Sequence, residues 1–489
     1  MNKALLPEHF INFITPCLPS HLNLQDFIDY CAKPLRKSIR VNTLKVSTED
    51  FVEKATQQGW RLTPIPWCKD GFWLQRPDEQ EQQIQLGNTL SHLTGEFYIQ
   101  EASSMLPPVA LLYKQTDTLD LACLDVAAAP GSKTTQLAAL MNNQGVIVAN
   151  EFSSSRVKVL SANIQRCSVT NTALTHMDGR MFIHLKEQFG AILLDAPCSG
   201  EGTVRKDVDS MKNWTEQSVH DIASVQRDLI DAAFHALKPN GVMIYSTCTL
   251  NQIENQQVCL WLKEKYGDAV EFESLADLFA GAENSTTTEG FLHVWPQIYD
   301  SEGFFVARIR KKASVDHQLE NPFTKLGQFP FKPLSKKNSQ QLQSFLASQF
   351  GMNDFPLAAC SQRETKKALE VWYFPPKLEA LKGKVKFARV GIKLAELAKH
   401  GFKLEHNLAI NFAQLAKQQT QELSAHQCQA YWQGKDIDGD FNKLNKGEVI
   451  VCYQGQALGF AKKLPDRLKN QLPRELVRDN LDFSDQYNQ

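Results

Sequence analysis

The sequence predicts an α/β protein built around a mainly parallel β-sheet with helices on both faces. Two observations predict this architecture. Short apolar segments alternate with helical segments between residues 116 and 312, an order typical of parallel sheets. Several of these segments are followed by an acidic residue or a cysteine, and in open α/β sheets the reactive groups collect beyond the carboxyl ends of the strands.

Six apolar segments are the predicted strands of this sheet. They are LACLDV (121–126), VIVAN (146–150), ALTHM (173–177), AILLD (191–195), VMIYS (242–246) and GFFVARI (303–309). Helical stretches separate them in the first part of the region, and a long one precedes VMIYS. We therefore assign residues 116–312 to one domain, in a chain of 489 residues that is long enough for roughly three domains.

The region before this domain, residues 1–115, has a mixed pattern and predicts an α+β unit. Amphipathic helical stretches such as PEHFINFITPCL alternate with strand-like pieces such as KSIRVNTLKV. Arg36, Lys37, Arg40 and Lys45 form a small basic cluster around that strand. The cluster is either a solvated strand edge or a contact for RNA phosphates, which makes Arg36 and Arg40 candidate RNA ligands.

After residue 312 the regular alternation stops. Residues 313–380 contain an amphipathic helix near 340–350 and are expected to form a connecting domain. Residues 381–489 carry 17 basic and 12 acidic side chains, a net charge of +5 in a chain whose formal net charge is −1. GEVIVCYQGQALGFAKKL in this part predicts two strands of a small β-rich module.

Composition excludes several classes of protein. A net charge of −1 argues against a uniformly basic coat for nucleic acid, while leaving room for a local basic patch. The sequence shows neither a secretory signal nor a run of about 18 apolar residues, so we expect a cytoplasmic protein without a membrane partner. The 11 cysteines are scattered, without CxxC pairs or zinc-type spacing, so we expect neither disulfides nor a metal site.

The segment DVAAAPGSKTTQLA follows the first predicted strand and opens a helix. Its small residues let the backbone turn tightly and approach a ligand. It lacks the GxxxxGK[ST] spacing of a phosphate-binding loop. The turn is explained about as well by close helix–strand packing as by cofactor binding. The candidate cofactor residues are Asp125, Val126, Ala127, Ala128, Ala129, Pro130, Gly131 and Lys133.

Acidic residues follow each of the first three predicted strands. Asp125 ends the first, Glu151 follows the second, and Asp178 follows the third. A carboxylate at the end of the second strand typically binds ribose hydroxyls, and one after the third can meet an adenine amino group. Each acid alone can equally be a solvated loop residue, but three at successive strand ends favour a ribose-and-adenine ligand.

Two cysteines and a third acid follow the later strands. AILLDAPCSG brings Asp195 and Cys198 to the end of one strand, and VMIYSTC brings Cys248 to the end of the next. Parallel strands deliver these side chains to one crevice. Cysteine thiolates are strong nucleophiles, but from the chemistry alone either cysteine qualifies.

Taken together, DVAAAPGSKTTQLA, LLDAPCSGEGTVRKD, YSTCTLNQIEN and EGFFVARIRK resemble the RNA 5-methylcytosine methyltransferase family (RsmB/NOP family). The resemblance covers about residues 40 to 312. It implies a Rossmann-like domain with a seven-stranded sheet and S-adenosyl-L-methionine as cofactor. It also implies Cys248 as nucleophile, Cys198 in product release, and Asp195 in contact with the base and the cofactor. Gln226, Glu254 and Asn255 match recurring polar positions of the family, with supporting roles.

The basic C-terminal part is similar to a PUA-like RNA-binding domain found in the branch of this family that modifies bacterial 16S ribosomal RNA. The similarity lies in ALGFAKKL and KNQLPRELVR. It implies ribosomal RNA as partner, within the assembled small subunit, and a monomeric enzyme. Further candidate RNA contacts are Arg205, Lys206, Lys462 and Lys469.

Two other functions stay open at this point. Transfer RNA is an alternative substrate, because the catalytic motifs do not read the RNA and only the appended domains can. A non-catalytic ribosome assembly factor is an alternative of another class, against which the intact Cys198, Cys248 and Asp195 argue. An amino-methylating enzyme is disfavoured, since its strand-end motif is typically NPPY or DPPY, where this chain has DAPC.

Overall fold

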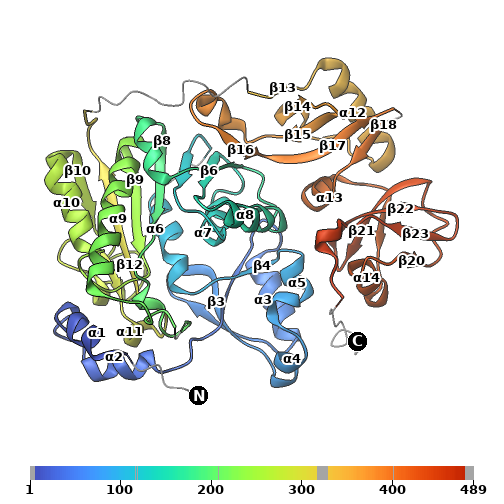
Figure 1. Ribbon diagram of the computed structural model, residues 1–489. Coiled ribbons are helices and arrows are strands. Elements are labelled where there is room, and N and C mark those ends of the chain that lie inside the picture. The colour runs from blue at the N-terminus through green and yellow to red at the C-terminus, as the bar shows by residue number, and fades with distance from the viewer. Residues whose placement is uncertain are drawn as a thin grey trace.

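The computed structural model describes residues 6–115, 117, 119–207, 209–316, 329–399 and 401–479. The strands among these residues form four sheets. The sheets follow one another along the chain, except that β16 (Phe387–Val390) lies between strands of the third sheet and joins the central one. In Figure 1 the large central sheet lies on the left, the first sheet below the centre and the two C-terminal sheets on the right. Every helix in the described ranges is too short or too polar to cross a membrane.

The first sheet is antiparallel and has the order β2-β3-β1-β4. Its strands are β1 (Ser38–Val41), β2 (Arg61–Ile65), β3 (Cys68–Gln75) and β4 (Phe97–Ile99). The helices of this region are α1 (Glu8–Ile14), α2 (Leu24–Cys31), α3 (Thr48–Gln57), α4 (Asp78–Gln83), α5 (Leu90–Leu93) and α6 (Leu106–Leu112).

Helix α3 illustrates how local sequence builds this unit. The Ser47 side chain caps its first turn by accepting a hydrogen bond from the Asp50 backbone N–H at 3.0 Å. Phe51 and Ala55, four residues apart, lie on one face and are both buried. They pack on the sheet beside Ile39 of β1 and Phe97 of β4, so this region has its own core.

The central sheet has the order β10-β12-β9-β8-β5-β6-β7-β16, with β11 paired to β12. Its strands are β5 (Ala122–Asp125), β6 (Val146–Asn150), β7 (Thr172–Thr175), β8 (Phe189–Asp195), β9 (Leu237–Thr247), β10 (Val270–Glu273), β11 (Leu292–Val294), β12 (Phe304–Lys311) and β16 (Phe387–Val390). The neighbours β9, β8, β5, β6 and β7 run parallel, whereas β12 and β10 are antiparallel. The α/β fold is confirmed, and β11 and β16 extend its seven strands.

Helices cover both faces of this sheet. They are α7 (Ser132–Leu140), α8 (Ser154–Arg166), α9 (Glu216–Ala236), α10 (Gln256–Tyr266) and the short α11 (Pro296–Tyr299). Consecutive residues of β8 point to opposite faces: Leu194 joins a core with α9 and α10, and Leu193 joins a core with α6, α7 and α8. Burial on both faces explains why these strands are apolar throughout. The carboxyl ends of the five parallel strands meet at one edge.

The third sheet is antiparallel and has the order β13-β14-β15-β17-β18. Its strands are β13 (Phe331–Pro333), β14 (Cys360–Glu364), β15 (Leu369–Tyr373), β17 (Ile392–Ala398) and β18 (Gly401–Leu404), and its helices are α12 (Lys336–Phe350) and α13 (His406–Phe412). Leu342, Leu346 and Phe350 of α12 are fully buried against this sheet.

The fourth sheet has the order β19-β21-β22-β23-β20. Its strands are β19 (Thr420–Glu422), β20 (Ile437–Asp438), β21 (Gly447–Tyr453), β22 (Gln456–Lys463) and β23 (Arg467–Asn470), and helix α14 (Ala425–Trp432) packs on it. The expected division between residues 380 and 381 falls before β17, β18 and α13, which join the third sheet. We propose that the last domain instead begins near residue 417, between α13 and β19.

Candidate active site

The loop from Val126 to Gly131 joins β5 to α7 at the edge where the parallel strands end. The Val126 N–H donates to the Leu193 carbonyl oxygen at 3.0 Å, and the Ala128 N–H donates to the Asn150 carbonyl oxygen at 2.7 Å. Gly131 has φ +107°, and a Cβ there would lie 3.0 Å from the Leu160 side chain. Glycine therefore lets the loop approach α8 closely. Val126, Ala128 and Ala129 are buried, Ala127 is half-buried, and Pro130 is exposed.

Asp125 ends β5 beneath this loop and is buried. The Thr134 hydroxyl donates to its Oδ2 at 2.6 Å, whereas its Oδ1 has no hydrogen-bond partner among the described residues. Burial raises the pKa of Asp125 to about 7, against the hydrogen bond from Thr134 and the charge of Lys133. A buried carboxyl oxygen without a partner is costly, so it marks a position suited to a ligand.

The other two predicted acids follow the adjacent strands. Glu151 is buried after β6, where its carboxylate accepts from the backbone N–H groups of Ala129 at 3.3 Å and Ser153 at 2.9 Å. Asp178 is half-buried after β7, and Arg180 donates to it at 2.6 Å. The hydrogen bond from Arg180 lowers the pKa of Asp178, which therefore stays ionised.

These residues fit the cofactor that the family resemblance implies. Asp125 ends β5, Glu151 follows the end of β6 by one residue and Asp178 follows the end of β7 by three. These strands are neighbours in the order β5-β6-β7, so the three residues lie along one edge. The unpartnered Oδ1 of Asp125 and the Glu151 carboxylate at the loop backbone offer acceptors for hydroxyl and amino groups. S-adenosylmethionine carries such groups on its ribose, its adenine and its amino acid portion.

The two cysteines lie next to each other. Cys198 Sγ is 3.1 Å from Cys248 Sγ, and both residues are half-buried. The contact arises because β8 and β9 are adjacent and parallel, with Asp195 opposite Ser246. The turns that follow the two strands therefore meet beyond the same edge of the sheet.

The surroundings of Cys198 favour its protonated form. The hydrogen bond with Cys248 and burial raise the pKa of Cys198 well above its usual value, and the nearby charge of Glu254 adds to this effect. Cys198 therefore holds its proton near neutral pH. A protonated Cys198 can donate a hydrogen bond to the Cys248 sulfur or pass a proton to a leaving group.

Lys133 connects the cofactor loop to the cysteine region. Its Nζ donates to Asp195 Oδ2 at 2.7 Å and to the Ser104 hydroxyl at 2.9 Å. The Ser246 hydroxyl donates to the other oxygen, Asp195 Oδ1, at 2.8 Å. Burial opposes the charge on Lys133, but the ion pair with Asp195 outweighs it and raises the pKa of Lys133 overall. Asp195 is thereby held at the edge shared by both parts of the site.

A network of buried hydrogen bonds joins the two turns that carry Cys198 and Cys248. Gln226 of α9 donates to the Pro197 carbonyl oxygen and to Glu254, both at 2.8 Å. Glu254 accepts from the Ser199 backbone N–H at 3.0 Å, and Glu201 accepts from the Asn251 side-chain amide at 2.7 Å. The network ties residues 197–201 to residues 249–254. It fixes the relative position of the two cysteines.

A pair of acids lies beside Lys133. The Glu302 backbone N–H donates to Glu101 Oε1 at 3.1 Å, and Glu302 Oε1 is buried without a hydrogen-bond partner among the described residues. Burial and the negative charge of Glu101 raise the pKa of Glu302 to about 8. Gly303, the next residue, donates to the Gly202 carbonyl oxygen, and Gly202 donates to the Cys248 carbonyl oxygen, both at 3.0 Å. This pair therefore adjoins the Cys248 turn.

The structure contradicts two of the expected RNA contacts. Arg40 is 2% exposed, and its guanidinium donates to Gln100 at 2.9 Å and to Thr135 at 3.0 Å. Arg205 is 8% exposed, and its guanidinium donates to three backbone carbonyls and to Asp300. Both expectations were wrong, because the guanidinium groups are buried and bind the protein itself.

The other expected RNA contacts are accessible. Lys206, Lys462 and Lys469 are exposed, and the two C-terminal lysines lie directly opposite each other on β22 and β23. Arg36 is exposed as well, although it stacks over Trp73 at 4.2 Å.

Sequence reasoning missed the buried acids Glu201 and Glu302 and the hydroxyl of Ser104. Each lies inside or beside a motif that carries the family resemblance: SGEG, EGFF and EASSM. The sequence did offer one signal for the two acids: each stands next to a glycine in a motif that flanks a strand. Acidic residues in such places are rarely buried unless they have a partner. Their hydrogen-bond partners come from other segments, so the sequence alone could not identify them.

Comparison with known proteins covers nearly the whole chain. A family model described as 16S rRNA methyltransferase RsmB/F matches residues 109–310. Three further models match most of the rest of the chain. The model for the N-terminal domain of 16S rRNA methyltransferase RsmF matches residues 6–102, and that for the pre-PUA domain of ribosomal RNA small subunit methyltransferase F matches residues 331–412. The model for the methyltransferase RsmF PUA domain matches residues 418–478.

Curated relatives match at high identity. The chain is 53% identical over 480 residues to ribosomal RNA small subunit methyltransferase F of Aeromonas salmonicida, with 98% of each chain covered. It is 54% identical over 478 residues to the protein of the same name from Vibrio atlanticus, again with 98% of each chain covered. The resemblance predicted from the motifs is confirmed.

Solved structures match 63% of the chain. A methyltransferase homolog protein from Pyrococcus horikoshii is 32% identical with a TM-score of 0.52, covering 63% of this chain and 100% of that chain. NSun6 from Pyrococcus horikoshii with SFG is 22% identical with a TM-score of 0.55, covering 63% of this chain and 99% of that one. The second likeness is one of fold.

Proposed function

Because this chain belongs to the 16S rRNA methyltransferase RsmB/F family, we propose that it methylates carbon 5 of a cytosine in small-subunit ribosomal RNA. The methyl donor is S-adenosylmethionine. The observation that carries the proposal is the 3.1 Å contact between Cys198 and Cys248, beside an Asp195 that Lys133 holds in place. Methyl transfer to an amino or hydroxyl group requires no thiol, whereas transfer to carbon 5 requires a nucleophile.

Carbon 5 of cytosine is a poor nucleophile until carbon 6 is attacked. In the proposed reaction the Cys248 sulfur forms a bond to carbon 6, and the electrons of the 5,6 double bond move to carbon 5. When bound, S-adenosylmethionine supplies an electrophilic methyl group that accepts these electrons. The carbon 5 proton then passes to solvent water, the electrons of that carbon–hydrogen bond re-form the 5,6 double bond, and the sulfur–carbon 6 bond breaks with its electrons on sulfur to release Cys248.

The two thiols divide this work. Cys248 acts as the nucleophile, and Cys198 assists release of the methylated base. The motif resemblance implies this division, and a protonated Cys198 beside Cys248 can donate a proton to the departing sulfur. Its 3.1 Å distance from Cys248 is suitable for such a transfer.

Asp195 and Lys133 orient the substrate base. Asp195 accepts from Lys133 and from Ser246, and each of its oxygens keeps a lone pair for the base edge. The target base must leave its stack to reach this crevice, or be unpaired already. Asp125, Val126 to Gly131, Glu151 and Asp178 hold the cofactor on the neighbouring strands.

The accessible lysines support an RNA substrate. Lys462 and Lys469 form an exposed cross-strand pair of like charges on the last sheet, and Glu448 of β21 is opposite Lys462 on its other side. Two adjacent exposed cations can contact neighbouring phosphates. Lys206 is exposed on the chain that follows the Cys198 turn. We propose that a monomer of this enzyme acts in the cytoplasm on RNA within the assembled small subunit.

The test is transfer of labelled methyl from S-adenosylmethionine to small subunits, to naked small-subunit RNA and to transfer RNA, followed by digestion to nucleosides. We expect label in 5-methylcytosine from the small subunit. Label confined to transfer RNA would overturn small-subunit RNA as the substrate, while methylation of cytosine carbon 5 would stand. Absence of label in all three substrates would contradict methyltransferase activity and would favour a non-catalytic assembly factor.

The matched control is Cys452→Ala, which removes another half-buried cysteine from a different domain. It should transfer label like the wild type, whereas Cys248→Ala should transfer none. Equal loss in both variants would mean that the effect comes from folding and not from the site.

A further inference from the structure

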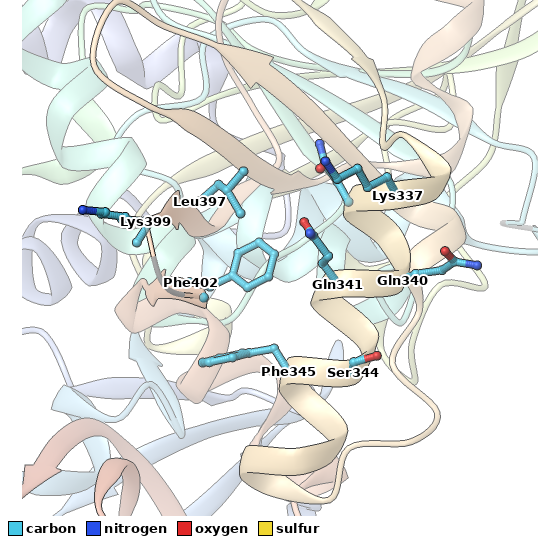
Figure 2. Close-up of a pocket in the computed structure, with 11 residues that line it drawn as sticks. Lys337, Gln340, Gln341, Ser344, Phe345, Leu397, Lys399 and Phe402 are labelled. Carbon is cyan, nitrogen blue, oxygen red and sulfur yellow. The ribbon is translucent and has the colours of Figure 1, made fainter.

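A groove with a volume of about 640 Å³ lies in the third sheet unit, outside the proposed active site. Helix α12 forms one wall, and the hairpin of β17 and β18 forms the other (Figure 2). The two walls come from segments about 60 residues apart in the sequence and are brought together by the sheet. The catalytic proposal uses none of the residues that line the groove.

The lining residues provide three kinds of chemistry. Lys337 and Lys399 supply positive charge, and none of the described lining residues is acidic. Gln340, Gln341 and Ser344 supply polar groups whose side chains form no hydrogen bond within the described part of the protein. Figure 2 shows the Gln341 side chain pointing into the groove beside Phe402.

The floor of the groove is aromatic. Phe345 is half-buried, Phe402 is 8% exposed, and their ring centroids are 5.6 Å apart. Gly401 has φ +92°, and a Cβ there would lie 3.2 Å from the Phe345 ring. The glycine thus lets the hairpin approach α12 closely, and part of the Phe345 ring remains open to the groove.

Core packing holds both walls of the groove in place. Leu342 and Leu346 of α12 are fully buried against the sheet, in the same core as Phe402. The start of α12 is also favourable for an anion, because its first turn has no acidic residue and carries two lysines, Lys336 and Lys337. A ligand therefore meets a preformed site.

The groove is connected directly to the catalytic sheet. Strand β17, whose end lines the groove, follows β16 after the single residue Gly391, and β16 pairs with β7 of the central sheet. Gly391 has φ +58°, and a Cβ there would lie 1.9 Å from the Tyr373 carbonyl oxygen. A ligand held in the groove is thus held by a chain segment that is paired to the edge of the catalytic sheet.

We propose that this groove binds an unpaired nucleotide of the substrate RNA. The base stacks on Phe345, the amide of Gln341 contacts the base edge, and Lys337 and Lys399 contact phosphates. Aromatic rings with neighbouring amides and cations are the means by which proteins bind single-stranded RNA. The proposal rests on the proposed function and adds a second contact with the RNA, remote from the target cytosine.

The first experiment measures RNA affinity at several salt concentrations. The probe is naked small-subunit RNA with a fluorescent label. Each phosphate contact on a single strand contributes about 0.7 to the slope of log affinity against log salt. We expect Lys337→Ala/Lys399→Ala to reduce that slope by about 1.4 and to weaken binding by about tenfold or more at ~0.1 M salt.

The matched control is Lys366→Ala/Lys367→Ala. These two lysines are exposed on the same domain, in the turn between β14 and β15, and do not line the groove. The control should keep the wild-type slope to within about half a unit. An equal loss in the control would mean diffuse attraction to the domain and would overturn the groove as a site.

The second experiment tests stacking. Phe345→Leu keeps an apolar side chain but removes the ring, and we expect RNA binding to weaken about fivefold or more. Phe345→Tyr keeps the ring and should bind like the wild type. Unfolding temperatures of both variants are measured alongside; wild-type affinity in a folded Phe345→Leu variant would overturn the stacking contact.

Methyl transfer measured in the same samples separates the two proposals. If the wild type transfers no label to RNA, the proposed function fails, whatever the groove variants do. If the wild type transfers label and all groove variants bind and methylate equally well, the groove inference fails while the function stands. A loss seen with assembled subunits but absent with naked RNA would assign the groove to a ribosomal protein and overturn the RNA occupant.

Discussion

Cys198 Sγ lies 3.1 Å from Cys248 Sγ, although the two residues are 50 positions apart in the sequence. Adjacent parallel strands produce this contact, since Asp195 of β8 is opposite Ser246 of β9 and each cysteine follows within a few residues. Two thiols at this distance share a hydrogen bond, so the protonation of one depends on the other.

The cysteines should have separable roles. We expect Cys248→Ala to lower methyl transfer by at least about 10³-fold, because the covalent step is lost. Cys198→Ala should instead accumulate a protein–RNA adduct, because attack proceeds while release stalls. A denaturing gel would show a slowly migrating band that nuclease removes. A Cys198→Ala enzyme without such a band would contradict the division.

The ion pair between Lys133 and Asp195 should matter for both stability and activity. The Lys133 side chain is 11% exposed and that of Asp195 is 28% exposed, so removing the charge of one partner leaves the other poorly compensated. We expect Lys133→Met to lower the free energy of unfolding by about 2 kcal/mol. Denaturant titration measures this value.

The double variant separates the two effects. Lys133→Met/Asp195→Asn removes both charges and should recover most of the stability. It should remain inactive in the methyl-transfer assay, because the proposed contact of Asp195 with the base is lost. Recovery of activity together with stability would show that the pair is structural.

Glu302 should make stability fall as the pH rises. Burial and the charge of Glu101 raise the pKa of Glu302 from its ordinary value of 4.5 to about 8 in the folded protein. The positive charges of Lys206, Lys133 and Arg205 oppose this rise. A raised folded pKa means that the protonated form is preferred in the native state. The contribution of Glu302 to the free energy of unfolding is therefore full below pH 4.5, decreases as the pH rises and is lost above pH 8.

The measurement compares unfolding free energies at pH 6 and pH 9. The wild type should lose a few kcal/mol more over this interval than Glu302→Gln, whose side chain stays neutral. The control is Glu283→Gln, an exposed acid that should leave the pH dependence as in the wild type. Identical profiles for the wild type and Glu302→Gln would contradict a protonated Glu302.

Arg205 and Lys206 are neighbours with opposite expected phenotypes. Arg205 donates to three backbone carbonyls and, at 2.7 Å, to Asp300, so Arg205→Ala leaves buried acceptors unpaired. We expect this variant to lose about 3 kcal/mol of stability. Lys206 is exposed, so Lys206→Ala should change stability by less than about 0.5 kcal/mol while weakening RNA binding. Thermal unfolding and RNA affinity, measured on both variants, check the contrast.

The sequence by itself determined the α/β fold, the order of its strands along the chain and the convergence of Asp195, Cys198 and Cys248 on one crevice. These features depend on local patterns, because an apolar strand followed by a turn delivers the turn residues to the carboxyl edge of a parallel sheet. The same rule placed Asp125, Glu151 and Asp178 along the neighbouring strands β5, β6 and β7.

Only the tertiary structure decided which charged groups are buried and which segments pair. Arg40 and Arg205 read as exposed cations in the sequence, yet their partners come from segments 60 to 172 residues away. The pairing of β16 with β7, the contact between Cys198 and Cys248 and the groove between α12 and the β17–β18 hairpin depend likewise on distant contacts. Burial and hydrogen bonding are set by what packs around a side chain, and local sequence does not contain that information.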